Sequence, residues 1–250
     1  DEVKKRYSAF NSESQKMTTI EADIKLPLYD IENDVPDDPN AYGLVGWLEN
    51  DESFLIYDQF DIWQIDPMGV KPSINITGGL GRKNNLVLRN IILDREARFI
   101  KNNQTLLLNV FNQKNKGSGL KTHIMGTLFE ITASTATLPM RISAVSKAKD
   151  ASVLSFGTET FQRSTNISVI DWKPNSLLQD VQTAISLHQP NPQQAQYNWG
   201  TAELFTWKSY TGKIAEGLVY KPEDFDPKKK YPMIAYFYER SSDGLYGYSA

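Results

Sequence analysis

The sequence of 250 residues contains no cysteine, which excludes disulfide bonds and zinc sites with cysteine ligands. Its net charge is only −3, so it offers no basic surface for nucleic acid, and no nucleic-acid partner is expected. No apolar run approaches the roughly 18 residues of a transmembrane segment, and no signal peptide is visible. Because the chain begins with Asp1 rather than methionine, we expect a processed or truncated product.

The sequence also lacks the usual marks of a serine hydrolase site. No Gly-x-Ser-x-Gly pentapeptide occurs, and the nearest text, Gly117-Ser118-Gly119, has the wrong spacing. Only two histidines are present to act as a general base. His123 lies in an alternating run that predicts a strand, and His188 precedes a proline-rich stretch that predicts a loop. Neither has a candidate serine beside it in the sequence, so neither is predicted to be catalytic.

Two further segments superficially suggest ligand sites. The stretch 30–40 is rich in carboxylates but lacks the spacing and the glycine of an EF-hand, so it is predicted to be a turn-rich acidic loop. The glycines of 78–81 lack the spacing of a phosphate-binding loop and open no obvious helix, so they predict a turn between sheets. No metal and no cofactor are expected.

What the sequence does contain is a loose repeat of β-rich runs. Hydrophobic residues make up 40% of the chain and charged residues 23%, which is enough for a folded core. From about residue 43, apolar runs and polar turns alternate with a period of about 50 residues, close to that of a four-stranded propeller blade. The three units are 53–66, 105–124 and 152–171. They predict a mainly β chain with a partial β-propeller of three to four blades. Trp47, Trp63 and Trp172 are predicted to pack between blades.

The segment 191–240 has a different pattern. It predicts a strand at 203–207, a turn at 211–213 and a second strand at 214–220. A loop rich in proline and lysine follows, and then an apolar strand at 233–238.

This C-terminal text resembles the prolyl oligopeptidase and dipeptidyl peptidase IV-like serine peptidases. The resemblance rests on Tyr-Lys-Pro at 220–222 and on Lys-Lys-Tyr-Pro at 229–232, followed by an apolar run that closes with Tyr238. Weaker likeness to bacterial members extends over 46–63 and 81–85. The resemblance implies that 1–190 is a propeller portion, and that 191–250 is the connection with the first strands of an α/β-hydrolase domain.

The resemblance also implies a function. The parent protein would be a serine peptidase that cleaves short peptides, periplasmic or secreted, and compatible with a homodimer. Tyr238 would donate its hydroxyl to the oxyanion of the tetrahedral intermediate. This chain alone lacks the nucleophilic serine, histidine and aspartate of such a site and is predicted to be inactive. A non-catalytic propeller scaffold, or an acyl-aminoacyl or esterase-like hydrolase of the same fold, are the alternatives.

Overall fold

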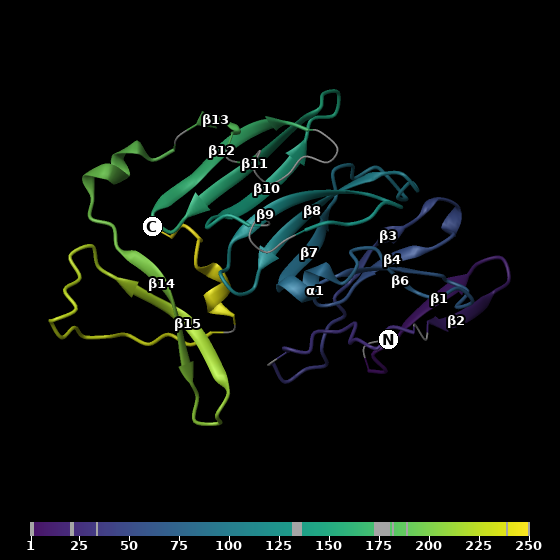
Figure 1. The fold of residues 1–250 in the computed structure, drawn as a ribbon, viewed down its shortest axis with the longest axis horizontal. Coiled ribbons are helices and arrows are strands. Elements are labelled where there is room, and N and C mark those ends of the chain that lie inside the picture. The colour runs from purple at the N-terminus through teal and green to yellow at the C-terminus, as the bar shows by residue number, and fades with distance from the viewer. Residues whose placement is uncertain are drawn as a thin grey trace. The chain divides into compact units, whose positions relative to one another are not determined.

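The structure, a computed structural model, describes residues 3–20, 23–33, 35–131, 137–172, 181, 183–188, 190–238 and 240–249 (Figure 1). It consists of antiparallel sheets with short helical turns. None of the helices within these residues is long and apolar enough to span a membrane. The strands are β1 (Tyr7–Asn11), β2 (Lys16–Ile20), β3 (Leu44–Trp47), β4 (Phe54–Tyr57), β5 (Ile62–Ile65), β6 (Ile74–Asn75), β7 (Leu86–Ile91), β8 (Thr105–Asn112), β9 (Ser118–Ile124), β10 (Arg141–Lys147), β11 (Val153–Thr160), β12 (Arg163–Asp171), β13 (Ile185–His188), β14 (Thr201–Lys208) and β15 (Ile214–Lys221). The helical elements are η1 (Glu49–Asp51), α1 (Leu80–Asn84), η2 (Pro192–Gln196) and η3 (Ser241–Gly244).

Contacts divide the chain into two compact units. The first contains the described residues of Asp1–Phe111 and Leu120–Ala136, and the second those of Asn112–Gly119, Thr137–Trp172 and Gln179–Ala250. Compactness alone does not assign either unit to a propeller or a hydrolase domain. The domain boundary near residue 190 therefore stays a prediction.

In the first unit, β3 to β6 form a four-stranded antiparallel sheet in sequence order, as expected of one propeller blade (Figure 1). All four residues of β4 are buried, although successive side chains of a strand point to opposite faces. Leu55 and Tyr57 belong to a core shared with β7 and β8, whereas Phe54 and Ile56 belong to a second core that includes Ile20. This sheet is therefore covered on both faces, which explains why every residue of β4 is apolar.

Of the tryptophans predicted to pack between blades, Trp47 and Trp63 pack against a core, and whether it lies between blades stays a prediction. Trp47 and Trp63 pack against the second core, between the β3–β6 sheet and the β1–β2 hairpin. The ring of Trp47 lies 5.0 Å from that of Phe54, between centroids. The packing role of Trp172 stays a prediction.

In the second unit, β10 to β13 form another four-stranded antiparallel sheet in sequence order. Leu154 and Phe156 of its second strand are buried, so this sheet also has an apolar core face. The loop predicted at His188 is wrong, because Ile185–His188 pairs with β12 and forms the edge strand β13. Pro190 follows, and proline cannot donate to a ladder, so the strand ends just after the histidine.

The predicted hairpin after residue 200 is confirmed. β14 and β15 pair antiparallel over eight residues each. Gly212, with a φ of +83°, supplies the left-handed conformation in the turn between them.

The strand predicted at 233–238 is wrong, since residues 231–238 form no regular element. No strand among the described residues pairs with this run. Without a partner, its backbone groups gain nothing from an extended ladder.

Candidate functional site

Tyr238, the predicted oxyanion donor, ends this unpaired apolar run. Its side chain is 72% exposed, and its ring stacks on that of Tyr236 with 6.5 Å between centroids. The Ser241 hydroxyl donates to the Tyr238 carbonyl at 3.2 Å, so the backbone is held from the C-terminal side. The phenol is thus open to solvent, and nothing in the described residues opposes its use as a hydrogen-bond donor.

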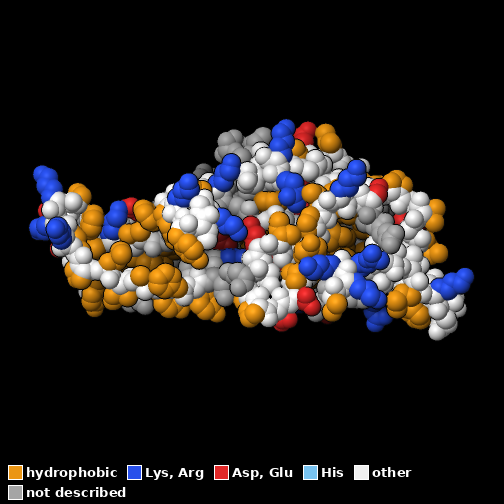
Figure 2. All heavy atoms as spheres, turned by 90° about the horizontal axis from the view of Figure 1, so that it is seen from below, with side chains coloured by type: hydrophobic (Ala, Val, Ile, Leu, Met, Phe, Trp, Pro, Cys, Tyr) orange, Lys and Arg blue, Asp and Glu red, His pale blue; other side chains and the backbone are white. Residues whose placement is uncertain are grey.

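Several apolar side chains near Tyr238 in the sequence and on β14 are exposed. Ile234 is 96% exposed and Phe237 88% exposed. Phe205 and Trp207 of β14 stack on each other, with 5.8 Å between ring centroids, and are also exposed. Figure 2 shows exposed hydrophobic side chains on one face of the molecule. Exposed apolar surface of this kind typically marks a contact surface.

The two histidines do not build a catalytic site. His123 lies on β9, is 3% exposed and meets the edge of Phe129 at 5.2 Å between ring centroids. Burial lowers the pKa of His123, and the charge of Lys121 lowers it further, so the imidazole is neutral at pH 7. Its Nε2 has no hydrogen-bond partner among the described residues. His188 is exposed on β13. Both are best explained as strand residues.

Residues 76–79 form the turn predicted between the sheets, but the expectation that no helix opens there is wrong, because the one-turn helix α1 begins at Leu80. The Asp61 side chain stabilises the first turn of that helix. Its Oδ1 accepts hydrogen bonds from the Thr77 hydroxyl at 2.7 Å and from Gly81 N at 2.9 Å, and its Oδ2 accepts from Arg82 N at 3.0 Å. An internal carboxylate therefore occupies the first amides of α1, where a phosphate would otherwise bind.

The described residues of the acidic stretch 30–40 form turns at 31–32 and bends at 35–37, as predicted. Its carboxylates are used locally. Asp30 Oδ1 accepts from Glu32 N at 3.0 Å, for example. Nowhere in the described part of the chain do three or more acidic or histidine side chains come together as metal ligands would.

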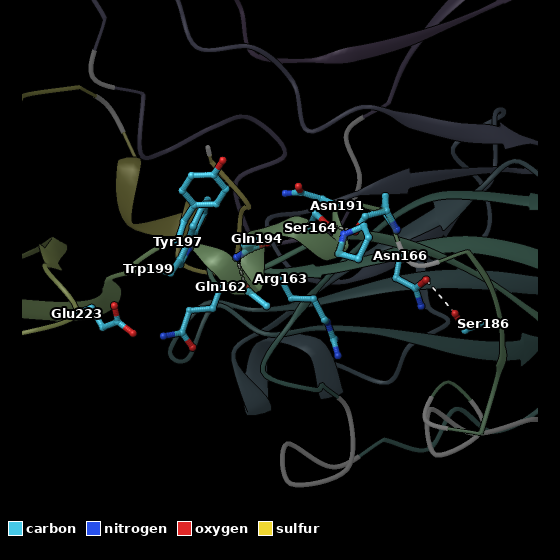
Figure 3. A pocket seen from close by; sticks show the side chains of 13 residues that line it. Gln162, Arg163, Ser164, Asn166, Ser186, Asn191, Gln194, Tyr197, Trp199 and Glu223 are labelled. Atoms are coloured by element: carbon cyan, nitrogen blue, oxygen red, sulfur yellow. Dashed lines mark hydrogen bonds between the residues drawn. The ribbon is translucent and has the colours of Figure 1, made fainter.

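A polar pocket lies in the second unit, beside the edge of the β10–β13 sheet (Figure 3). Its volume is about 560 Å³. Arg163 and Asn166 enter it from β12, the aromatic residues Tyr197 and Trp199 come from the segment before β14, and Glu223 follows β15. The walls combine one cation, one anion, amides and aromatic faces, a mixture that suits polar ligands with apolar parts.

Hydrogen bonds and ring stacking fix the side chains that line the pocket. The Trp199 indole donates to Phe161 O at 2.9 Å and stacks on Tyr248, with 5.3 Å between centroids and 2° between planes. The Tyr248 hydroxyl accepts from Asn191 Nδ2 at 2.7 Å. Gln194 Nε2 donates to Gln162 O at 2.7 Å. The sequence did not predict this pocket. Residues 191–199 have the pattern of a connecting segment, and their side-chain partners lie up to 57 positions away in the sequence.

No protein-family model matches the chain, and no curated protein matches it either. Among solved structures it is similar to a protein from Bacteroides ovatus assigned as a dipeptidyl aminopeptidase IV. The sequence identity is 12%, the TM-score is 0.54, and the match covers 91% of this chain and 38% of the other. The chain has the fold of that part of the protein. It is a mainly β chain of several antiparallel sheets, consistent with a partial propeller. That residues 191–250 begin an α/β-hydrolase domain stays a prediction. The resemblance stated from the sequence is thereby confirmed at the level of the fold.

Two looser matches are an AtxE2 isopeptidase and prolyl oligopeptidase B from Galerina marginata. The first has 10% identity and a TM-score of 0.40 over 91% of this chain and 31% of the other. The second has 9% identity and a TM-score of 0.40 over 73% of this chain and 24% of the other. The chain therefore spans well under half the length of the structures it is similar to.

Proposed function

We propose that this chain is the propeller-side portion of a serine peptidase that hydrolyses short peptides, together with the first strands of its hydrolase domain. The observation that carries the proposal is the likeness in fold to the dipeptidyl aminopeptidase IV-type structure over 91% of the chain. The sequence of residues 214–238 supports the proposal independently, because it contains the motifs by which the chain resembles these peptidases.

In this proposal Tyr238 is the residue of the chain that takes part in chemistry. Acyl transfer through a serine passes through a tetrahedral intermediate whose oxyanion needs hydrogen-bond donors. The Tyr238 phenol is exposed and lies at the end of a run that would become a strand once a neighbouring strand pairs with it. The nucleophile and its base come from the rest of the enzyme. Because a serine nucleophile and water suffice to hydrolyse a peptide, the proposed enzyme needs no cofactor, and a periplasmic or secreted location fits the proposal.

The test uses the full-length protein with a Gly-Pro or Ala-Pro chromogenic substrate, and the 250-residue chain beside it. We expect activity in the former and none in the latter. Tyr238→Phe should lower kcat by roughly 100- to 1000-fold with little change in KM, the range seen when one oxyanion donor is removed. Tyr236→Phe is the matched control, since Tyr236 stacks on Tyr238 and is similarly exposed. Equal activity of the two variants would refute the role of Tyr238.

A further inference from the structure

Lys116 is a buried cation in a tight turn. The turn joins β8 to β9, and the Asn112 carboxamide accepts from Lys114 N at 2.9 Å while the Asn112 carbonyl accepts from Lys116 N at 2.8 Å. Lys116 has a left-handed φ of +62°. A Cβ on Gly117 would lie 2.5 Å from the Leu138 carbonyl oxygen, so only glycine fits there. The turn thus has one geometry, and that geometry directs Lys116 inward.

The Lys116 side chain is 4% exposed and is matched by two carboxylates. Its ammonium binds Glu216 Oε1 of β15, and it binds Asp243 Oδ1 of η3 at 3.0 Å. The Ser242 hydroxyl donates to the same Glu216 oxygen at 2.8 Å. A buried charge without partners is very unfavourable, so these contacts belong together as one ionic cluster of Lys116, Glu216, Ser242 and Asp243.

Glu216 stays ionised at neutral pH. Burial raises the pKa of Glu216, but the hydrogen bonds from Lys116 and Ser242 and the charge of Lys116 outweigh it, and the net shift is downward. Glu216 is therefore a carboxylate at neutral pH, and its contact with Lys116 is an ion pair.

The ionic cluster holds the chain immediately after Tyr238. Ser242 and Leu245 are both buried, which fixes η3 in place. Ser241, the first residue of η3, donates its hydroxyl to the Tyr238 carbonyl. Four positions separate Tyr238 from Ser242, so an anchor at η3 limits where the Tyr238 phenol can point, whereas the run before it has no such support.

We propose that Lys116 is a positioning residue for Tyr238. It ties η3 to β15 and so sets the place of the phenol relative to the reacting carbonyl. This role rests on the proposed function, in which Tyr238 is the oxyanion donor. Lys116 is 122 positions before Tyr238 and touches no reacting group, so its effect is indirect.

The anchor is tested first in the 250-residue chain by hydrogen exchange. The amides of Leu245 and Gly247 donate within the η3 region at 3.2 and 2.8 Å and report on its order. Lys116→Met should speed their exchange by about tenfold or more, a factor that corresponds to about 1.4 kcal/mol. Lys116→Arg should restore part of the protection. Lys114→Met is the control, because Lys114 lies in the same turn and is exposed.

The positioning role is tested by kinetics in the full-length protein. Lys116→Met should lower kcat about tenfold with KM unchanged, and Lys116→Arg should recover part of that loss. In a Tyr238→Phe background the same change should have almost no further effect, because the group it positions is gone.

The outcomes separate the two proposals. Faster exchange without a fall in kcat overturns the positioning role, and so does unchanged exchange. A fully active Tyr238→Phe variant overturns the proposed oxyanion role and the positioning role together, while the exchange data still decide whether the anchor exists.

Discussion

Two aspartates of the first unit allow the effect of burial on a hydrogen-bonded carboxylate to be measured. Asp61 is 1% exposed and accepts three hydrogen bonds, two of them from the backbone of α1. Asp66, after β5, accepts from three backbone amides, those of Met68, Val70 and Lys71, at 2.8–3.0 Å, but lies near the surface. The two side chains differ mainly in their access to water.

The loss of stability in each variant depends on which hydrogen-bond donors lose their acceptor when the aspartate is removed. Asp61→Ala leaves the amides of Gly81 and Arg82 without their acceptor, at about 1–3 kcal/mol for each buried group, whereas the Thr77 hydroxyl can still donate to Asn75 Oδ1. Losing an unfavourably buried charge offsets part of this, so we expect about 3 kcal/mol of lost stability. Asp66→Ala should cost about 1 kcal/mol, because water reaches the freed amides.

The assay is urea unfolding at pH 7, followed by tryptophan fluorescence and circular dichroism together to check that the transitions coincide. The expected difference between the two variants is about 2 kcal/mol. Equal costs within about 0.5 kcal/mol would show that burial does not decide the contribution of Asp61, and would refute the reasoning.

The pH dependence provides a second check with a definite sign. Burial raises the pKa of Asp61, and the neighbouring Asp58 adds to this, against the hydrogen bonds it accepts. The pH-dependent part of its contribution therefore favours the folded state below its ordinary pKa and is lost as pH rises through the folded-state pKa, while the hydrogen bonds that the carboxylate accepts remain at pH 7. Hydrogen bonds from Lys71 and Met68 lower the pKa of Asp66, so its contribution is present above the ordinary pKa and is lost as pH falls. Asp61→Asn and Asp66→Asn should therefore change stability with opposite slopes on acidification.

Two further predictions concern the packing of the sheets. Phe156→Ala, at a side chain that is 1% exposed, should cost about 3–5 kcal/mol in urea unfolding, and a cost below about 1 kcal/mol would contradict its place in the core of the β10–β13 sheet. Gly81→Ala would put a Cβ 2.9 Å from the carbonyl oxygens of Phe60 and Leu86, so it should cost about 1–3 kcal/mol, whereas Gly244→Ala, where a Cβ meets nothing within 4 Å, should be nearly neutral by the same measurement.

Much of the strand pattern could be predicted because it rests on local properties. Phe54–Tyr57 is an apolar run between turns, and a run of that length in a repeat is typical of a strand buried on both faces. The β14–β15 hairpin follows from two alternating runs and from Gly212 between them. Side-chain alternation and turn conformation depend on near neighbours, so the sequence alone was sufficient for these elements.

Other features depended on contacts that no local pattern encodes. Residues 233–238 have the composition of a strand, yet they stay unpaired because a strand exists only through its neighbours. His188 became a strand residue because β12 offered an edge to pair with. Lys116 is an unremarkable charge in the sequence, and only the approach of β15 and η3, more than 95 residues away, makes it a buried ion. The sequence alone determined the local conformations and the resemblance in fold. Tertiary structure decided which backbone edges are paired and which charges are buried, because both require partners brought together by folding.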